Sequence, residues 1–146
     1  MSEYILLAET IVYKNGKLTC INVLDSFKTV AMPSEFNFDI AVLCGPKWTK
    51  GEHKLSVKAV ASNGKEISLG EATINVPNED FVYNAFLNNV KITMDYSVSD
   101  LTFLVYDGDK EIISRKFPVI SMLVPKKNDE TNKEENKEEK KDKKKK

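Results

Sequence analysis

The chain has 146 residues, a formal net charge of zero and only 9% aromatic residues. A chain of this length usually forms one domain that buries roughly two thirds of the surface its unfolded form exposes, so a core needs neither a metal nor a disulfide. Ten lysines and seven acids lie in residues 126–146, against 12 cations and 15 acids in the preceding 125 residues. Neither part has the strongly basic face of a nucleic-acid-binding domain.

The first residues, "MSEYILLAETIVY", contain two glutamates and no Lys or Arg, so they lack the basic start of a secretory signal. No apolar run approaches the roughly 20 residues that cross a bilayer. We therefore expect a cytoplasmic protein that does not enter a membrane. Cys20 and Cys44 lie in apolar segments and are expected to be reduced, buried side chains; an inter-sheet disulfide is the alternative.

The first predicted element is a hairpin of residues 3–13 and 17–27. Its turn, "KNGK", places Asn-Gly between two apolar runs, and a type I′ turn needs positive φ at both central residues. "SNGK" at residues 62–65 and "DGDK" at residues 107–110 predict two more hairpins. The intervening segments therefore pair as antiparallel strands.

Alternating apolar residues mark the strands between these turns. In "EISLGEATINV" the alternation changes phase across Gly70, which predicts a bulge there. Two later segments, "LTFLVY" and "KEIISRKFPVI", complete the strand-like series. The residues predicted to face the core include Phe36, Phe38, Ile40, Val42, Cys44, Leu55, Val57, Ala59, Val90, Ile92, Met94, Tyr96 and Val98.

About eight such strands predict an all-β protein, a two-sheet antiparallel β-sandwich of immunoglobulin-like or C2-like type over residues 1–125. Residues 78–89 fit either a short helix or an irregular strand. Residues 126–146 contain no apolar side chain, so they are expected to form a disordered tail that acts mainly in solvation.

Several short motifs also suggest a family. They are "LLAE", "NGKL" and "INVLD" in the first hairpin, Pro33 after it, and "GEHKLSVKAVASNGKEI" from residue 51 to residue 67. Together they resemble a family of short bacterial proteins of uncharacterised function, over about 120 residues. The resemblance implies a compact β-sandwich and supplies no catalytic residue.

The only histidine, His53, has no accompanying nucleophile motif, so we expect it at the surface or at a strand edge. Two distant cysteines and one histidine do not form a zinc site. Asp95, Asp100, Asp107 and Asp109 leave a calcium site as an alternative, although "DGD" is also an ordinary turn. The sequence therefore predicts a protein that is not an enzyme and holds no metal or cofactor.

The loop "CGPKWTKGEH" contains the only tryptophan. Trp48 either plugs one end of the sandwich or contacts a partner, because tryptophan in a loop is common at binding surfaces. The first hypothesis is an interaction domain whose protein partner meets this loop or an exposed sheet edge. The second is binding of a small ligand or glycan. The candidate binding residues are Lys47, Trp48, Lys50, Tyr83 and Tyr106.

Overall fold

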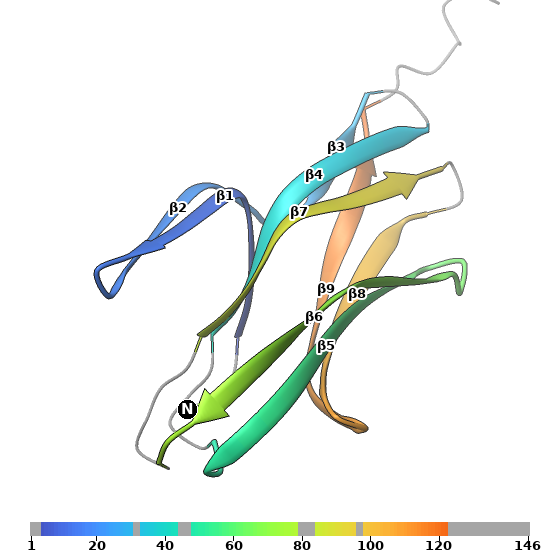
Figure 1. The fold of residues 1–146 in the computed structure, drawn as a ribbon. Coiled ribbons are helices and arrows are strands. Elements are labelled where there is room, and N and C mark those ends of the chain that lie inside the picture. The colour runs from blue at the N-terminus through green and yellow to red at the C-terminus, as the bar shows by residue number, and fades with distance from the viewer. Residues whose placement is uncertain (1–3, 31–32, 44–47, 79–83, 96–97, 123–146) are drawn as a thin grey trace, which may run out of the picture.

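The computed structural model describes residues 4–30, 33–43, 48–78, 84–95 and 98–122, and it is an all-β protein (Figure 1). These residues form nine strands and no helix. The strands are β1 (Tyr4–Lys14), β2 (Lys17–Leu24), β3 (Phe27–Thr29), β4 (Ser34–Leu43), β5 (Gly51–Ala61), β6 (Glu66–Val76), β7 (Asn84–Met94), β8 (Asp100–Asp107) and β9 (Lys110–Ser121).

The strands form two sheets, in the orders β2-β1-β4-β7 and β3-β9-β8-β5-β6. All but one of the pairings among the described residues are antiparallel, as predicted. The prediction was wrong for β3, which pairs with β9 in parallel, through Phe27 opposite Val119. Residue 27 is therefore not, as its pattern predicts, the end of the first hairpin, because the chain leaves β2 at Leu24 and crosses to the other sheet.

All three predicted hairpins are present. Asn15 and Gly16 have φ values of 52° and 71°, as a type I′ turn requires, and they join β1 to β2. Gly108 has a φ of 59° in the turn between β8 and β9. The loop between β5 and β6 is longer, and it closes through a hydrogen bond from the Gly64 amide to the Ala61 carbonyl at 2.8 Å. In each case a glycine supplies the positive φ.

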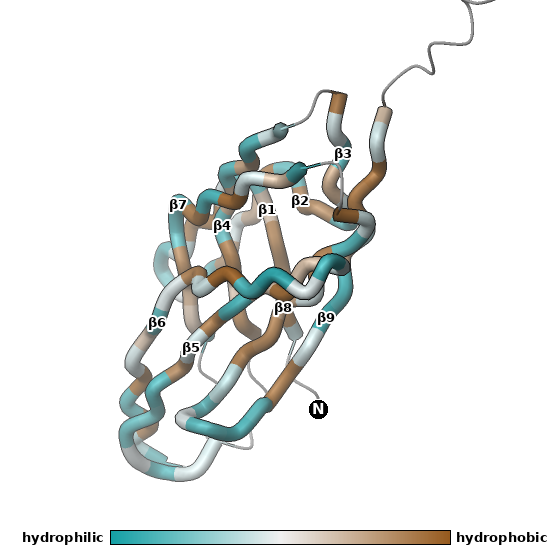
Figure 2. Tube along the Cα trace, turned by 90° about the vertical axis from the view of Figure 1, so that its right-hand side faces the viewer, coloured by the Kyte–Doolittle hydropathy of each residue, from teal (hydrophilic) through white to brown (hydrophobic). Residues whose placement is uncertain are grey.

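A single apolar core joins the facing sides of the two sheets. Figure 2 shows the alternation of hydrophobic and hydrophilic residues along most strands, which is expected where one face of each sheet is buried. Phe27 lies at the centre, with ring centroids 5.3 to 6.2 Å from four other phenylalanines, contributed by both sheets. These four are Phe36, Phe38, Phe103 and Phe117.

Most of the predicted core positions are confirmed. Leu55, Val57 and Ala59 are buried, and so are Phe38, Ile40, Val42, Val90, Ile92 and Met94. Phe36 and Val98 are half-buried. Cys44, Tyr96 and the predicted tail at 126–146 lie outside the described residues, as does part of the segment 78–89, whose last residues belong to β7.

The predicted bulge at Gly70 is confirmed. The pairing of β5 with β6 shifts by one residue, because Val57 faces Gly70 while Lys58 faces Ser68. Gly70 has a φ of 155°, and a Cβ added there would lie 3.2 Å from the Leu87 Cδ2 atom of β7. The bulge therefore falls where β6 of one sheet meets β7 of the other.

A second apolar cluster lies on the outer face of the β2-β1-β4-β7 sheet and was not predicted. It contains Ala8, Ile11 and Ala41, with Leu6, Leu18, Cys20, Leu43 and Phe86 packed against them. Figure 1 shows the far half of the β1–β2 hairpin turning away from the rest of its sheet. The β1 side chains that face this second cluster change from even positions, Leu6 and Ala8, to the odd position Ile11, so the hairpin packs its own cluster outside the main core.

Asp39 stabilises this change of direction. It is a buried carboxylate on β4, and its Oδ2 atom accepts a hydrogen bond from the Ile11 amide of β1 at 2.8 Å. Its Oδ1 atom accepts another from the Asn89 amide of β7 at 2.9 Å. Asn89 has a φ of 57° and lies where the pairing of β4 with β7 shifts. One side chain thus satisfies a backbone donor at an irregular point of each neighbouring strand.

Arg115, the only arginine of the chain, joins the two sheets along another side. Its Nη1 atom donates to the Ile5 carbonyl of β1 at 2.7 Å, although Arg115 belongs to β9. The guanidinium carbon lies 4.7 Å from the centroid of the Tyr4 ring and 4.5 Å from that of Phe117. A planar cation suits such stacking better than an ammonium group would.

Replacing Thr29 by Val is expected to stabilise the protein. Thr29 is 1% exposed, and its Oγ1 atom has no hydrogen-bond partner within the described residues. Valine has nearly the same shape and keeps the branched side chain that strands favour, so removing the buried hydroxyl should add about 1 kcal/mol to the free energy of unfolding. Urea denaturation measures this change. Thr73→Val, at an exposed position of β6, is the matched control and should change stability little.

Candidate functional site

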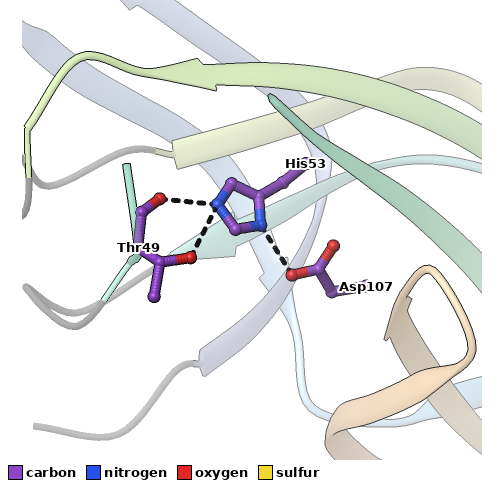
Figure 3. Close-up of polar contacts among 3 residues, drawn as sticks. All are labelled: Thr49, His53 and Asp107. Carbon is purple, nitrogen blue, oxygen red and sulfur yellow. Dashed lines mark hydrogen bonds and ion pairs between the residues drawn. The ribbon is translucent and has the colours of Figure 1, made fainter. Parts of the chain in front are cut away.

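The first candidate region is the contact network of His53 at the start of β5 (Figure 3). The imidazole Nδ1 atom lies 2.7 Å from Asp107 Oδ2 at the end of β8. The Nε2 atom lies 2.7 Å from the Thr49 carbonyl oxygen and 3.4 Å from its hydroxyl. The segment that precedes β5 and the last residue of β8 therefore both contact the His53 side chain.

The two contacts at 2.7 Å fit a protonated ring. A backbone carbonyl and a carboxylate only accept hydrogen bonds, so both ring nitrogens satisfy them only when each carries a proton. The pKa of His53 is raised above its ordinary 6.5, chiefly by the hydrogen bond to the Thr49 carbonyl and further by the Asp107 carboxylate, while partial desolvation opposes the rise. The network therefore favours an imidazolium ion.

Trp48 packs against the same ring. Its indole is 7% exposed and belongs to the main core cluster. The centroids of Trp48 and His53 are 4.9 Å apart, with the ring planes at 75°. This arrangement is the one expected of a plug at the end of the core, and a contact role for Trp48 would require its ring to leave that position.

His53 differs from the expectation of a surface or strand-edge residue. Its side chain is 12% exposed, and β5 lies between β6 and β8 in the sheet. The residues that could have indicated the pairing, His53 and Asp107, are 54 positions apart. Only the pairing of β5 with β8 brings them together, so local sequence pattern gave no signal.

The acidic residues considered for calcium do not form a metal site. Asp107 is paired with His53. Within the described ranges, no group of three or more His, Cys, Asp or Glu side chains could hold a metal ion. Asp95, Asp100 and Asp109 are among these described residues.

The other predicted binding residues are scattered. Lys50 is exposed next to Gly51. Tyr106 is half-buried, and the Lys58 ammonium lies 4.8 Å from the centroid of its ring. Lys47 and Tyr83 lie outside the described residues. Of the three described residues of this set, Trp48 is the one that joins the His53 network.

The second candidate region is the outward face of the β1–β2 hairpin. Five of the eight large apolar side chains that are exposed in the described part of the chain lie on these two strands. Thr10 pairs with Ile21 and Val12 pairs with Thr19, so these four residues share the face opposite Ile11 and Cys20. The exposed fractions are 47% for Val12, 50% for Ile21 and 56% for Val23. The sequence pattern predicts this hairpin as part of the fold and indicates no binding residue on it.

β2 is also a sheet edge. It pairs with β1 on one side and is the outermost strand in its sheet. An edge strand offers backbone donors and acceptors to an added strand, and proteins usually protect such edges with charge or irregularity. The main irregularity in β2 is Asn22, with a φ of 55° and an Nδ2 atom that donates to Glu9 Oε2 at 2.8 Å.

A groove continues from this edge toward β3. Its volume is about 340 Å³, within the range of pockets that take a side chain or a small ligand. Its lining mixes apolar and charged residues from β1, β2, β3, β4 and the β2–β3 connection: Glu9, Val23, Leu24, Asp25, Ser26, Phe27, Lys28, Phe36 and Asn37. Val23 belongs both to the groove lining and to the exposed apolar residues of the hairpin, and we call the groove and the hairpin face together the β2 edge surface.

Two further expectations concern membrane and thiol chemistry. The described residues contain no helix with the length and apolar character needed to span a membrane. Cys20 is a free, half-buried thiol in the second apolar cluster. Cys20 is thus less buried than predicted, and Cys44 lies outside the described residues.

The chain was compared with known proteins. No family model matches it, and no curated protein matches it. Among solved structures it is similar to the Pseudomonas fluorescens alkylpurine DNA glycosylase AlkC bound to DNA containing an abasic site analog, at 10% sequence identity and a TM-score of 0.34. The similarity covers 80% of this chain and 30% of the glycosylase chain. A likeness this low supports no conclusion about function.

Proposed function

We propose that this protein is a non-enzymatic, cytoplasmic interaction domain of bacterial origin that binds a protein partner through the β2 edge surface. The observation that carries the proposal is the concentration of exposed apolar side chains on a sheet edge: Val12, Ile21 and Val23 are each about half exposed on the β1–β2 hairpin. Exposed apolar groups next to unpaired strand backbone favour the addition of an extended segment from a partner.

The proposed architecture is a β-sandwich of immunoglobulin-like type. In such domains strands A, B and E share one sheet, and G, F, C and C′ follow one another in the other. The orders β1-β4-β7 and β9-β8-β5-β6 agree with this arrangement. β2 is then an additional strand that lengthens the A strand into a hairpin, and this added element carries the surface assigned to the partner. The resemblance to short bacterial β-sandwich proteins supports the same assignment.

The proposal can be tested by placing charge on the proposed contact face. In the variant V12K/I21K, capture of the partner from the native lysate should fall by at least about tenfold, because buried lysines at an apolar interface are strongly unfavourable. The control variant S68K/T73K places the same charges at exposed positions of β6, the outermost strand of the other sheet, and should capture the partner as the wild type does.

A second measurement distinguishes specific binding from adhesion. With the captured protein purified, amide exchange in β2 should slow on binding if a strand is added at this edge. Equal capture by both lysine variants, or unchanged exchange in β2, would contradict the proposal.

The groove of about 340 Å³ favours a second function, binding of a small ligand or glycan. As first predicted, such a ligand would instead stack on Trp48, Tyr83 or Tyr106 at one end of the sheets. A panel of sugars and small metabolites distinguishes the two sites, because a ligand should change the fluorescence of Trp48 if it stacks on that ring and not if it binds in the groove. A change in the NMR chemical shifts of Phe36, which lines the groove, would show binding there.

A further inference from the structure

We propose that His53 is a pH-sensitive latch that holds Trp48 and Thr49 against the end of the main core. The Thr49 carbonyl, the Asp107 carboxylate and the Trp48 ring all contact one imidazole. Two separate parts of the chain, the Trp48–Thr49 segment and the end of β8, thus meet at one side chain.

The geometry gives the latch its two states. In the protonated state Nδ1 donates to Asp107 and Nε2 donates to Thr49, both at 2.7 Å. When the ring loses one proton, one nitrogen becomes an acceptor that faces another acceptor, so one of the two contacts must break. If the proton leaves Nε2, the 2.7 Å hydrogen bond to the Thr49 carbonyl is lost, and of Thr49 only the hydroxyl, at 3.4 Å, can still donate to the ring. Thr49 directly follows Trp48 in the chain.

Asp107 is the charged group that contacts the ring among the described residues. From β8 the ring faces Asp107, and from β6 the residue opposite His53 is Ile74, which is uncharged. The neighbours on its own strand, Glu52 and Lys54, are exposed and point to the other face of the sheet. The β8–β9 turn is fixed independently, because the Gly108 amide donates to the Lys54 carbonyl at 3.0 Å. The position of Asp107 therefore does not depend on the Trp48–Thr49 segment.

The sign of the effect follows from the direction of the pKa shift. Contacts with Thr49 and Asp107 raise the pKa of His53 in the folded protein above 6.5. The stabilisation is therefore complete below pH 6.5 and disappears as the pH rises through the higher, folded-state pKa. The segment should be closed in mildly acidic solution and open in alkaline solution.

Trp48 fluorescence provides the test, because this chain has one tryptophan and one histidine. Between about pH 5 and pH 9 the emission of the full-length protein should shift to longer wavelength, and quenching of Trp48 by acrylamide should increase by about twofold or more. Emission wavelength and quenching are the readouts, since protonated imidazole itself lowers tryptophan intensity. His53→Gln should abolish the transition, and Cys20→Ser should leave it unchanged.

Nitrogen NMR of the wild-type imidazole keeps the test independent of any variant's folding. Below the transition both ring nitrogens should give the shifts of protonated sites, and Asp107→Asn should move the midpoint to lower pH. The inference is overturned if the ring is singly protonated at pH 6, if emission and quenching of the folded wild type do not change with pH, or if His53→Gln retains the transition.

Discussion

Replacing Phe27 by Ala is expected to lower the free energy of unfolding by about 4 kcal/mol, within the range for large-to-small changes in a core. Phe27 is 1% exposed and contacts phenylalanines of both sheets. It also belongs to β3, which has three residues and pairs only with β9 among the described strands. Loss of the ring should therefore open a cavity and release the short parallel strand as well.

Denaturation in guanidinium chloride, followed by circular dichroism, measures the change. Phe27→Leu is the matched control and should lose about 1 kcal/mol, since it keeps most of the buried area. A loss below 1 kcal/mol for Phe27→Ala would show that β3 contributes little to the core. Phe27 also lines the groove of the β2 edge surface, so the Ala variant tests the core and is not a control for binding.

The parts of the fold that sequence predicts are those set by local pattern. Asn15-Gly16 specifies its turn because both residues accept positive φ, and the phase change at Gly70 locates a bulge because strand side chains alternate strictly. Leu55, Val57 and Ala59 follow the same alternation. Each of these signals is contained within about ten residues.

What sequence pattern did not predict depends on contacts between distant segments. β3 pairs with β9 across about 90 residues, and "SFKT" has no alternation long enough to indicate a strand. The second apolar cluster is similar, because Leu6 and Ala8 alternate with Ile5 and Leu7 and the local sequence is apolar on both faces. Such a run indicates burial without specifying which face meets the core.

The roles of the rarest residue types in the chain also depend on contacts between distant segments. Trp48, His53 and Arg115 each occur once by type, and single residues of these types often attract functional hypotheses. In the structure Trp48 is buried in the main core and packs against His53, and Arg115 joins the two sheets. Their partners come from other strands, so composition alone could not assign these roles.

Replacing Asp39 by Ala is expected to lower the free energy of unfolding by about 3 kcal/mol, because it removes a charged acceptor from two backbone amides and leaves the Ile11 donor buried without a partner. Chemical denaturation measures the loss. Asp39→Asn keeps the shape and one carbonyl acceptor, so it should lose about half as much. Glu35→Ala, at an exposed position of the same strand, should change stability little.

The effect of Asp39→Ala should also be local, because the carboxylate fixes the point where the hairpin turns away from its sheet. The Ile11 amide binds Asp39 where β1 changes face, so amide exchange should accelerate in β1 and β2 more than in β5 and β8. Uniform acceleration in all strands would contradict this role. If the partner binds the β2 edge surface, Asp39→Ala should weaken binding at temperatures where the core remains folded, although Asp39 is buried and contributes no side chain to that surface. Asp39 would then contribute to binding indirectly, because it holds the hairpin that carries Val12 and Ile21 at the correct angle.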